Sequence, residues 1–244
     1  MALLNLPARL PAVGRSLPNG VGQRIGKAVL AAVDDAIERR WSHANEHAAN
    51  IEGDSIDARV AKLARSFAQE LGTVGAVTGA SAAVPAFGTG VAISAGVTEF
   101  GWFAVRSSEL ILTIAALHGH TQSTVEERRA WILSILVFGN GASEGFTKLA
   151  GEVGKGLGTK ATTRIPISVL RGINSSAGRT IVTKYGTKRG VVALGTALPF
   201  GIGAAVGGGA NYAIVQLLAR HANKFFKNLP YASVDPIETL NPSG

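Results

Sequence analysis

Two long runs without a charged residue limit what this chain can fold into more than any other feature. The first spans residues 71–98 and the second spans residues 190–219, and both are rich in glycine and alanine. Each run is longer than the roughly 18 apolar residues that mark a candidate membrane span. Glycines at Gly-x-x-x-Gly spacing, such as Gly75 and Gly79, suit close contact between helices. The runs therefore predict either membrane spans or tightly packed interior helices.

The charges that follow the first run favour the packed alternative. The apolar side chains of Ala80–Thr98 favour membrane insertion by only about 1.5–3 kcal/mol. A span extended into the following residues would include Glu99, Arg106 and Glu109, and each of these charges costs about 2.5–3.5 kcal/mol near the bilayer centre. A proline also interrupts each run. We therefore expect a soluble or peripheral helical domain rather than a membrane-spanning one.

The apolar residues recur at helical spacing, and no segment alternates as a strand does. The sequence predicts an all-α fold, a single helical domain over residues 21–229 with two glycine-rich apolar helical hairpins, which turn near Pro85 and Pro199. A disordered arm (residues 1–20) and a flexible tail (residues 230–244) flank it. Three predicted helices cover Arg24–Ala49, Val91–Leu117 and Ile202–Asn228. Another begins after the cap residue Asp54 and reaches Leu71, and another runs from a Ser123–Glu126 capping box to Phe138. A further helix is predicted to start near Pro166.

The N-terminal residues do not predict a secretory signal. Pro7, Arg9 and Pro11 interrupt the apolar stretch before a hydrophobic core of such a signal is complete. The chain has no cysteine, which excludes disulfides and cysteine-based zinc sites and fits a reducing compartment. We therefore expect a cytoplasmic protein, bound to a membrane peripherally if at all.

Positive charge is concentrated in the C-terminal third. The chain has a net charge of +8, and residues 153–234 contain 11 Lys and Arg but no Asp or Glu. An ordinary solvated face mixes both signs, so this segment predicts an anionic partner. Stacking aromatics are scarce there, which disfavours nucleic acid. We expect an anionic membrane surface, or else an acidic protein surface, to be bound by Lys160, Arg164, Lys184, Lys188 and Arg189.

Three charged residues fall within the long apolar helix predicted over Val91–Leu117. Glu99 and Arg106 are seven residues apart and share a helix face, and Arg106 can pair with Glu109 at i, i+3. One interpretation is a buried polar network that fixes helix packing, and the other is a polar site that holds a lipid headgroup. Because buried charges are usually paired, the network is favoured.

Histidine motifs give only weak signals for metal or catalysis. His43, Glu46 and His47 match H-x-x-E-H, but no third ligand is apparent. His118 and His120 flank Gly119 and are better explained by a loop role. No nucleophile elbow, phosphate-binding loop or dinucleotide fingerprint occurs. We therefore expect no metal, no cofactor and no catalytic residue.

The sequence resembles the EcsC family, named for a bacterial protein encoded beside an ABC transporter, in "TGASAAVPAFGTGVAISAGVTEFGWFAVRSSELILTIAALHGHTQSTVEERRAWILSIL". The C-terminal "LPFGIGAAVGGGANYAIVQLLARHANKFF" is similar to the closing helix of that family, so the resemblance covers roughly residues 55–228. It implies a helical, largely bacterial protein associated with transporter function and protein secretion, with no catalytic residues to carry over. His118 departs from the pattern, because the family leads us to expect an aromatic ring there.

Together these features predict a non-enzymatic accessory protein that binds anionic lipid or a membrane protein such as an ABC transporter. Two alternatives stay open. One is an enzyme that acts on a lipid-like substrate through Glu99, Arg106 and His118. The other is a homo-oligomer that inserts its apolar hairpins into a bilayer.

Overall fold

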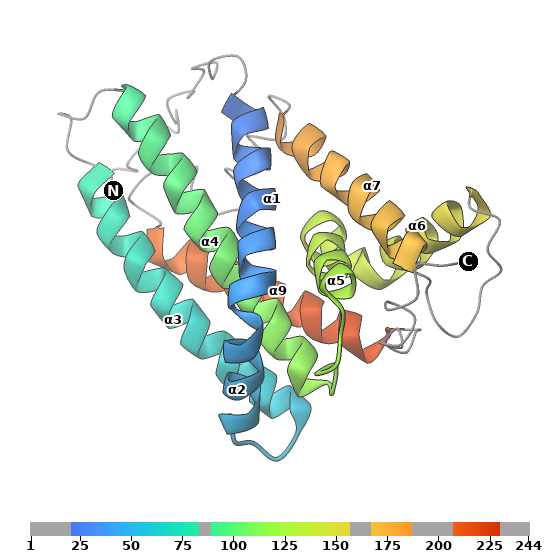
Figure 1. The fold of residues 1–244 in the computed structure, drawn as a ribbon. Helices are drawn as coiled ribbons and strands as arrows, with labels where there is room; N and C mark the ends of the chain where they lie inside the picture. The colour runs from blue at the N-terminus through green and yellow to red at the C-terminus, as the bar shows by residue number, and fades with distance from the viewer. Residues whose placement is uncertain (1–20, 83–88, 157–166, 187–206, 230–244) are drawn as a thin grey trace, which may run out of the picture.

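The computed structural model describes residues 21–82, 89–156, 167–186 and 207–229, and every regular element in these ranges is helical (Figure 1). The elements are α1 (Val21–Arg39), α2 (Trp41–Asn50), α3 (Ile56–Ala82), α4 (Thr89–Leu117), α5 (Val125–Phe138), the 3-10 helix η1 (Gly139–Gly141), α6 (Ala142–Gly156), α7 (Ile167–Gly186) and α9 (Gly207–Lys227). They pack around one core, so the predicted all-α domain is confirmed. The turns of both predicted hairpins lie outside the described residues.

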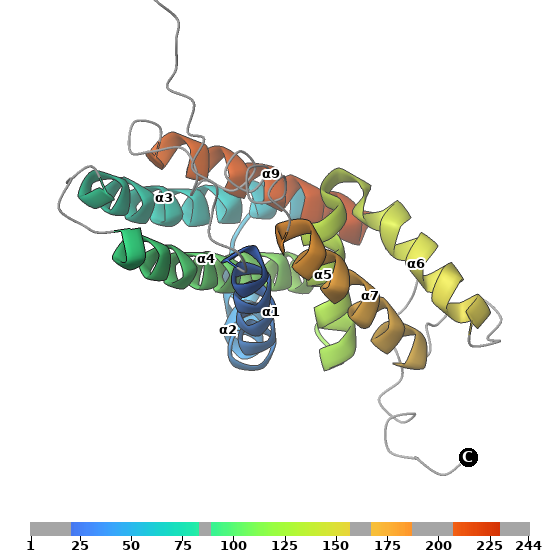
Figure 2. The ribbon, with the colours of Figure 1, turned by 90° about the horizontal axis from the view of Figure 1, so that it is seen from above.

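The central helix is α4, because its sequence is apolar on nearly every side in its second half. Leu110, Ile111, Leu112 and Ile114 are all fully buried, although they point in different directions around the helix. Helices α3 and α9 lie on one side of α4, and α1 and α2 lie on the other (Figure 2). The group α5, α6 and α7 packs beside this stack. Any charge on the enclosed part of α4 must therefore find a partner inside the protein.

The predicted helix over Arg24–Ala49 is divided at Arg40 into α1 and α2. Arg128 of α5 contacts both sides of the junction between α1 and α2. Its Nη1 donates to the carbonyl oxygen of Ile37 at 3.5 Å, and its guanidinium lies 4.6 Å from the centre of the Trp41 ring. Burial lowers the pKa of Arg128, which is enclosed between these helices. The break therefore coincides with a contact from a distant part of the chain.

The capping box of α5 lies one residue later than the sequence predicted. Thr124, not Ser123, is the N-cap: its Oγ1 accepts from the backbone N of Glu127 at 3.2 Å, and the Glu127 carboxylate accepts from the backbone N of Thr124 at 2.7 Å. Both pairs fit the S/T-x-x-E spacing, so the spacing alone could not decide between them. Glu126 is therefore not part of the capping box, and its Oε1 lies 3.5 Å from Nε of Arg171 in α7.

Other predicted boundaries differ in detail. The cap of α3 is Ser55 rather than Asp54, since the Ser55 hydroxyl accepts from the backbone N of Ala58 at 3.2 Å. Gly139, with φ of +55°, ends α5 as predicted for "GNG". The last helix was predicted over Ile202–Asn228, whereas α9 covers Gly207–Lys227 and residues 202–206 lie outside the described residues.

A glycine of α7 permits the close approach of α6. A Cβ atom at Gly172 would lie 2.4 Å from Cγ1 and 3.2 Å from Cγ2 of Val153, so the valine would have to shift to accommodate it. We expect Gly172→Ala to lower the free energy of unfolding by about 1–3 kcal/mol. The matched control is Gly151→Ala in α6, which has no heavy atom within 4 Å of the added Cβ and should stabilise by up to about 1 kcal/mol through helix propensity. Urea unfolding of both variants checks this, and equal stabilities would contradict the close approach.

Candidate functional site

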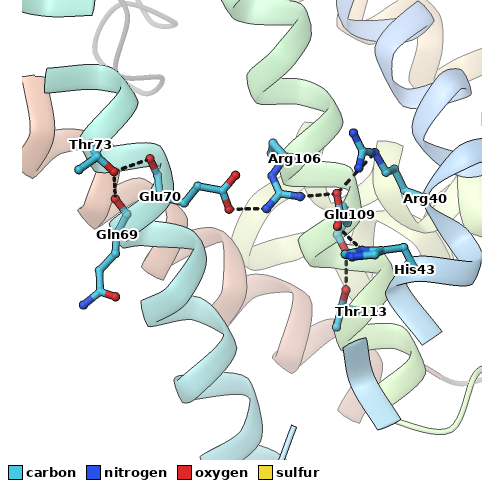
Figure 3. Close-up of polar contacts among 8 residues, drawn as sticks. All are labelled: Arg40, His43, Gln69, Glu70, Thr73, Arg106, Glu109 and Thr113. Carbon is cyan, nitrogen blue, oxygen red and sulfur yellow. Dashed lines mark hydrogen bonds and ion pairs between the residues drawn. The ribbon is translucent and has the colours of Figure 1, made fainter. Parts of the chain in front are cut away.

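A buried carboxylate on α4 lies at the centre of an ion network (Figure 3). The side chain of Glu109 is 0% exposed, and its Oε2 accepts from Nη1 of Arg106, one turn away, at 2.6 Å. The Nη2 group of Arg106 donates to Glu70 of α3, whose side chain is 43% exposed. Arg106 therefore bridges a carboxylate in the core and a carboxylate at the surface.

Arg40 and His43 approach Glu109 from the opposite side. Nε of Arg40, at the junction of α1 and α2, lies 3.7 Å from Oε2, and Nδ1 of His43 in α2 lies 2.7 Å from Oε1. Both side chains are partly exposed. The network therefore joins α2, α3, α4 and the α1–α2 junction, and it attaches the short polar helix α2 to the core.

A second histidine contacts the same aromatic ring as Arg106. The guanidinium of Arg106 lies 4.5 Å from the centre of the Phe67 ring, and His47 stacks against the same ring at a centroid distance of 6.0 Å. Burial alone would lower the pKa of Arg106, but hydrogen bonds and charges from Glu70 and Glu109 outweigh burial and raise it. Arg106 is therefore positively charged at neutral pH.

The sequence found part of this network. Arg106 and Glu109 pair as their spacing indicated, whereas the side chain of Glu99 lies outside the described residues. Glu70 and Arg40 were not anticipated, because no local pattern relates them to α4. The H-x-x-E-H match did mark His43, but its glutamate, Glu46, is exposed.

The composition of the network argues against a cation ligand. Arg106 and Arg40 both lie against Glu109, and their positive charges would repel a metal ion there. Among the described residues, no three His, Asp or Glu side chains are grouped so that they could hold a metal. The network is instead suited to fixing the helices in one arrangement.

His118 belongs to a separate contact at the far end of α4. Its Nε2 lies 2.8 Å from Oδ1 of Asn223, and Nδ2 of Asn223 donates to Asp57 at 2.7 Å. Because the carboxylate of Asp57 only accepts, it fixes the amide of Asn223, and His118 must donate through Nε2. Lys227, at 2.6 Å from Asp57, and Asn223 lower the pKa of this carboxyl. Twelve residues, or about 18 Å of helix, separate His118 from Arg106, so the two are not brought together.

Acidic side chains neutralise only part of the positive charge in the described part of the basic segment, residues 153–234. Acids from outside the segment pair with two of its cations: Glu126 with Arg171 at 3.5 Å and Asp57 with Lys227 at 2.6 Å. Arg220 and Lys224 of α9 are exposed, and the ion pairs of the described residues include neither. Of the predicted binding residues, Lys184 lies in α7, but its side chain is not described. Lys160, Arg164, Lys188 and Arg189 lie outside the described residues.

The sequence pattern of the EcsC protein family matches residues 10–228. The chain belongs to the EcsC family. The EcsC match begins earlier than the predicted residue 55 and therefore includes α1, α2 and the H-x-x-E-H segment. No curated protein and no solved structure matches the chain. The ion network and α9 are thus both parts of the EcsC region, and their roles have to be argued from their own geometry.

None of the helices in the described EcsC residues combines the length and the apolar character needed to cross a bilayer. The apolar second half of α4 is instead covered by other helices of the protein.

We expect this EcsC domain to lose stability in acid because of two half-buried histidines, His47 and His120. Burial lowers the pKa of His47, and His43 lowers it further; burial also lowers the pKa of His120, with a smaller effect of His118. Below the ordinary value of about 6.5, the unfolded chain therefore binds more protons than the folded chain does, and the free energy of unfolding falls as the pH falls.

Urea unfolding at about pH 7.5 and about pH 5.5, on either side of the ordinary histidine value, measures this loss. A variant carrying His47→Gln and His120→Gln should lose less stability between the two conditions than the wild type. Equal losses in both proteins would contradict the assignment to these histidines.

Proposed function

We propose that this EcsC protein is a non-enzymatic accessory protein that binds peripherally to an anionic membrane surface. The observation that carries the proposal is the exposed pair Arg220 and Lys224 on α9, within a segment of 82 residues, 153–234, that has no acid. Near an anionic surface each such cation is worth about 1 kcal/mol. Lys224 donates to the neutral carbonyl and amide oxygens of Asn140 at 3.2 and 3.3 Å, but among the described residues no acid pairs with Arg220 or Lys224.

The position of α9 supports the same proposal. Among the helices that the structure describes, it is the outermost on its side of the α3–α4 pair (Figure 2), so that none of them covers its outer side. Arg220 and Lys224 lie about one turn apart along its exposed side. The neighbouring aromatic residues Phe225 and Phe226 are buried, so they are not presented for stacking on bases, which favours lipid over nucleic acid.

Flotation with lipid vesicles tests the proposal. We expect the protein to float with vesicles that contain phosphatidylserine and to stay behind with neutral phosphatidylcholine vesicles. Binding should weaken when salt rises from about 0.1 M to about 1 M, because the Debye length falls from about 10 Å to about 3 Å. Equal flotation with both kinds of vesicle, or binding that is unchanged by salt, would overturn an electrostatic mechanism.

The family resemblance also suggests a membrane-protein partner such as an ABC transporter, in transport or protein secretion. Flotation with native bacterial membranes distinguishes it from lipid. Binding to native membranes that protease treatment abolishes, without binding to protein-free anionic vesicles, would favour the protein partner.

A further inference from the structure

We propose that α9 itself lies on the bilayer surface, with Leu217 inserted into the acyl boundary and with Arg220 and Lys224 at the lipid phosphates. This inference rests on the proposed function and adds the contacting element, its orientation and an apolar contribution to binding. The proposed occupant of this face is an anionic lipid surface.

The spacing of the exposed residues defines the contact face. Ala213, Leu217, Arg220 and Lys224 follow one another at intervals of four, three and four residues, so they form one stripe along the helix. We call these four residues the outer stripe. The opposite side of α9 is buried against the rest of the protein through Val215, Leu218, Ala219, Ala222, Phe225 and Phe226.

The outer stripe is divided along the helix axis. Its N-terminal half is apolar, and Leu217 is 47% exposed there; its C-terminal half is cationic and contains no acid. A helix that merely faces water usually carries both signs of charge. Apolar side chains beside cations are typical of helices that lie in a membrane interface.

The chemistry of each residue suits a different depth. Transfer of the Leu217 side chain from water to the acyl boundary lowers the free energy. The guanidinium of Arg220 presents paired donors to a phosphate. The ammonium of Lys224 donates to Asn140 in the structure, and its flexible stem allows it to exchange these neutral acceptors for a headgroup phosphate. An acidic protein surface would satisfy the two cations but would not bury Leu217 in hydrocarbon.

The cysteine-free sequence allows the contact to be located directly. Cys introduced as Leu217→Cys is the only thiol and can carry a nitrobenzoxadiazole label, whose emission rises and shifts to the blue in an apolar environment. The matched control is Ser42→Cys on α2, which is exposed and lies on the opposite side of the α3–α4 pair from α9 (Figure 2). With phosphatidylserine vesicles we expect the change at residue 217 and none at residue 42.

The outcomes separate the two proposals. If flotation shows bound protein while the label at residue 217 stays in water, the α9 contact is wrong and peripheral binding still stands. If the protein does not float, both proposals fail. An equal emission change at residues 217 and 42 would show unspecific adsorption and would also overturn the α9 contact.

Charge variants provide a second measurement. The Arg220→Gln and Lys224→Gln double variant should partition onto anionic vesicles roughly 30-fold more weakly, because two surface cations are lost. The control is Lys27→Gln with Arg39→Gln, which removes the same charge from exposed positions of α1, across the molecule from α9 (Figure 2). Its partitioning should change by only a few-fold. Equal weakening of both double variants would assign binding to net charge and overturn the α9 contact.

Discussion

Replacing Arg106 with Ala is expected to lower the free energy of unfolding by about 3 kcal/mol, the lower end of the range for breaking a buried ion pair. The variant leaves the carboxylate of Glu109 fully enclosed without its nearest guanidinium. Arg40, at 3.7 Å, and His43, at 2.7 Å, remain beside Glu109, and they keep the loss from being larger. Removal of the guanidinium from the Phe67 ring adds to the destabilisation.

The matched control acts on the outer end of the same network. Glu70 also bonds to Arg106, but its side chain is 43% exposed, and a partly exposed ion pair contributes little. Glu70→Gln should therefore cost less than about 1 kcal/mol. Urea unfolding of both variants provides the comparison, and an Arg106→Ala variant as stable as Glu70→Gln would refute a central role for the buried pair.

Reversing Lys184, Lys188 and Arg189 to Glu should weaken binding to phosphatidylserine vesicles by at least about 3 kcal/mol, or roughly a hundredfold. The three residues cluster in "KYGTKRG" in the middle of the acid-free segment. Each is expected to contribute about 1 kcal/mol near an anionic surface, and the new acids would add repulsion. Circular dichroism should show unchanged helix content, and neutral vesicles should bind poorly throughout.

The triple reversal and the α9 variants test different parts of the basic segment. Equal vesicle binding by the wild type and the triple variant would exclude the "KYGTKRG" cluster as a determinant. If the α9 double variant still bound more weakly, the membrane contact would be assigned to α9 alone.

Local sequence signals predicted much of the fold. The apolar stripe of α3 and the long apolar run of α4 follow directly from residues three and four apart, and the predicted end of α4 at Leu117 is the observed one. The break at Arg40 was not predictable in the same way. It coincides with the contact of Arg128, which approaches from α5, and the sequence of α1 and α2 contains no strong helix breaker at that point.

The candidate sites show the same difference between local and distant contacts. Arg106 and Glu109 share one helix turn, so their spacing was sufficient. Glu70, by contrast, is 36 residues from Arg106 in sequence, and only the packing of α3 on α4 brings it near. Similarly, the basic segment has no acid of its own, yet Asp57 of α3 reaches Lys227. Sequence counting therefore overestimated the unpaired positive charge.

The pairing of α3 with α9 has a consequence for the newly made chain. The two helices lie side by side, although about 120 residues separate the end of α3 from the start of α9. At translation rates of about 5–20 residues per second, the start of α9 is synthesised roughly 6–25 s after the end of α3. Throughout that interval the apolar surface of α3 that α9 later covers is open to water. The nascent chain therefore exposes this apolar surface to aggregation until α9 has emerged.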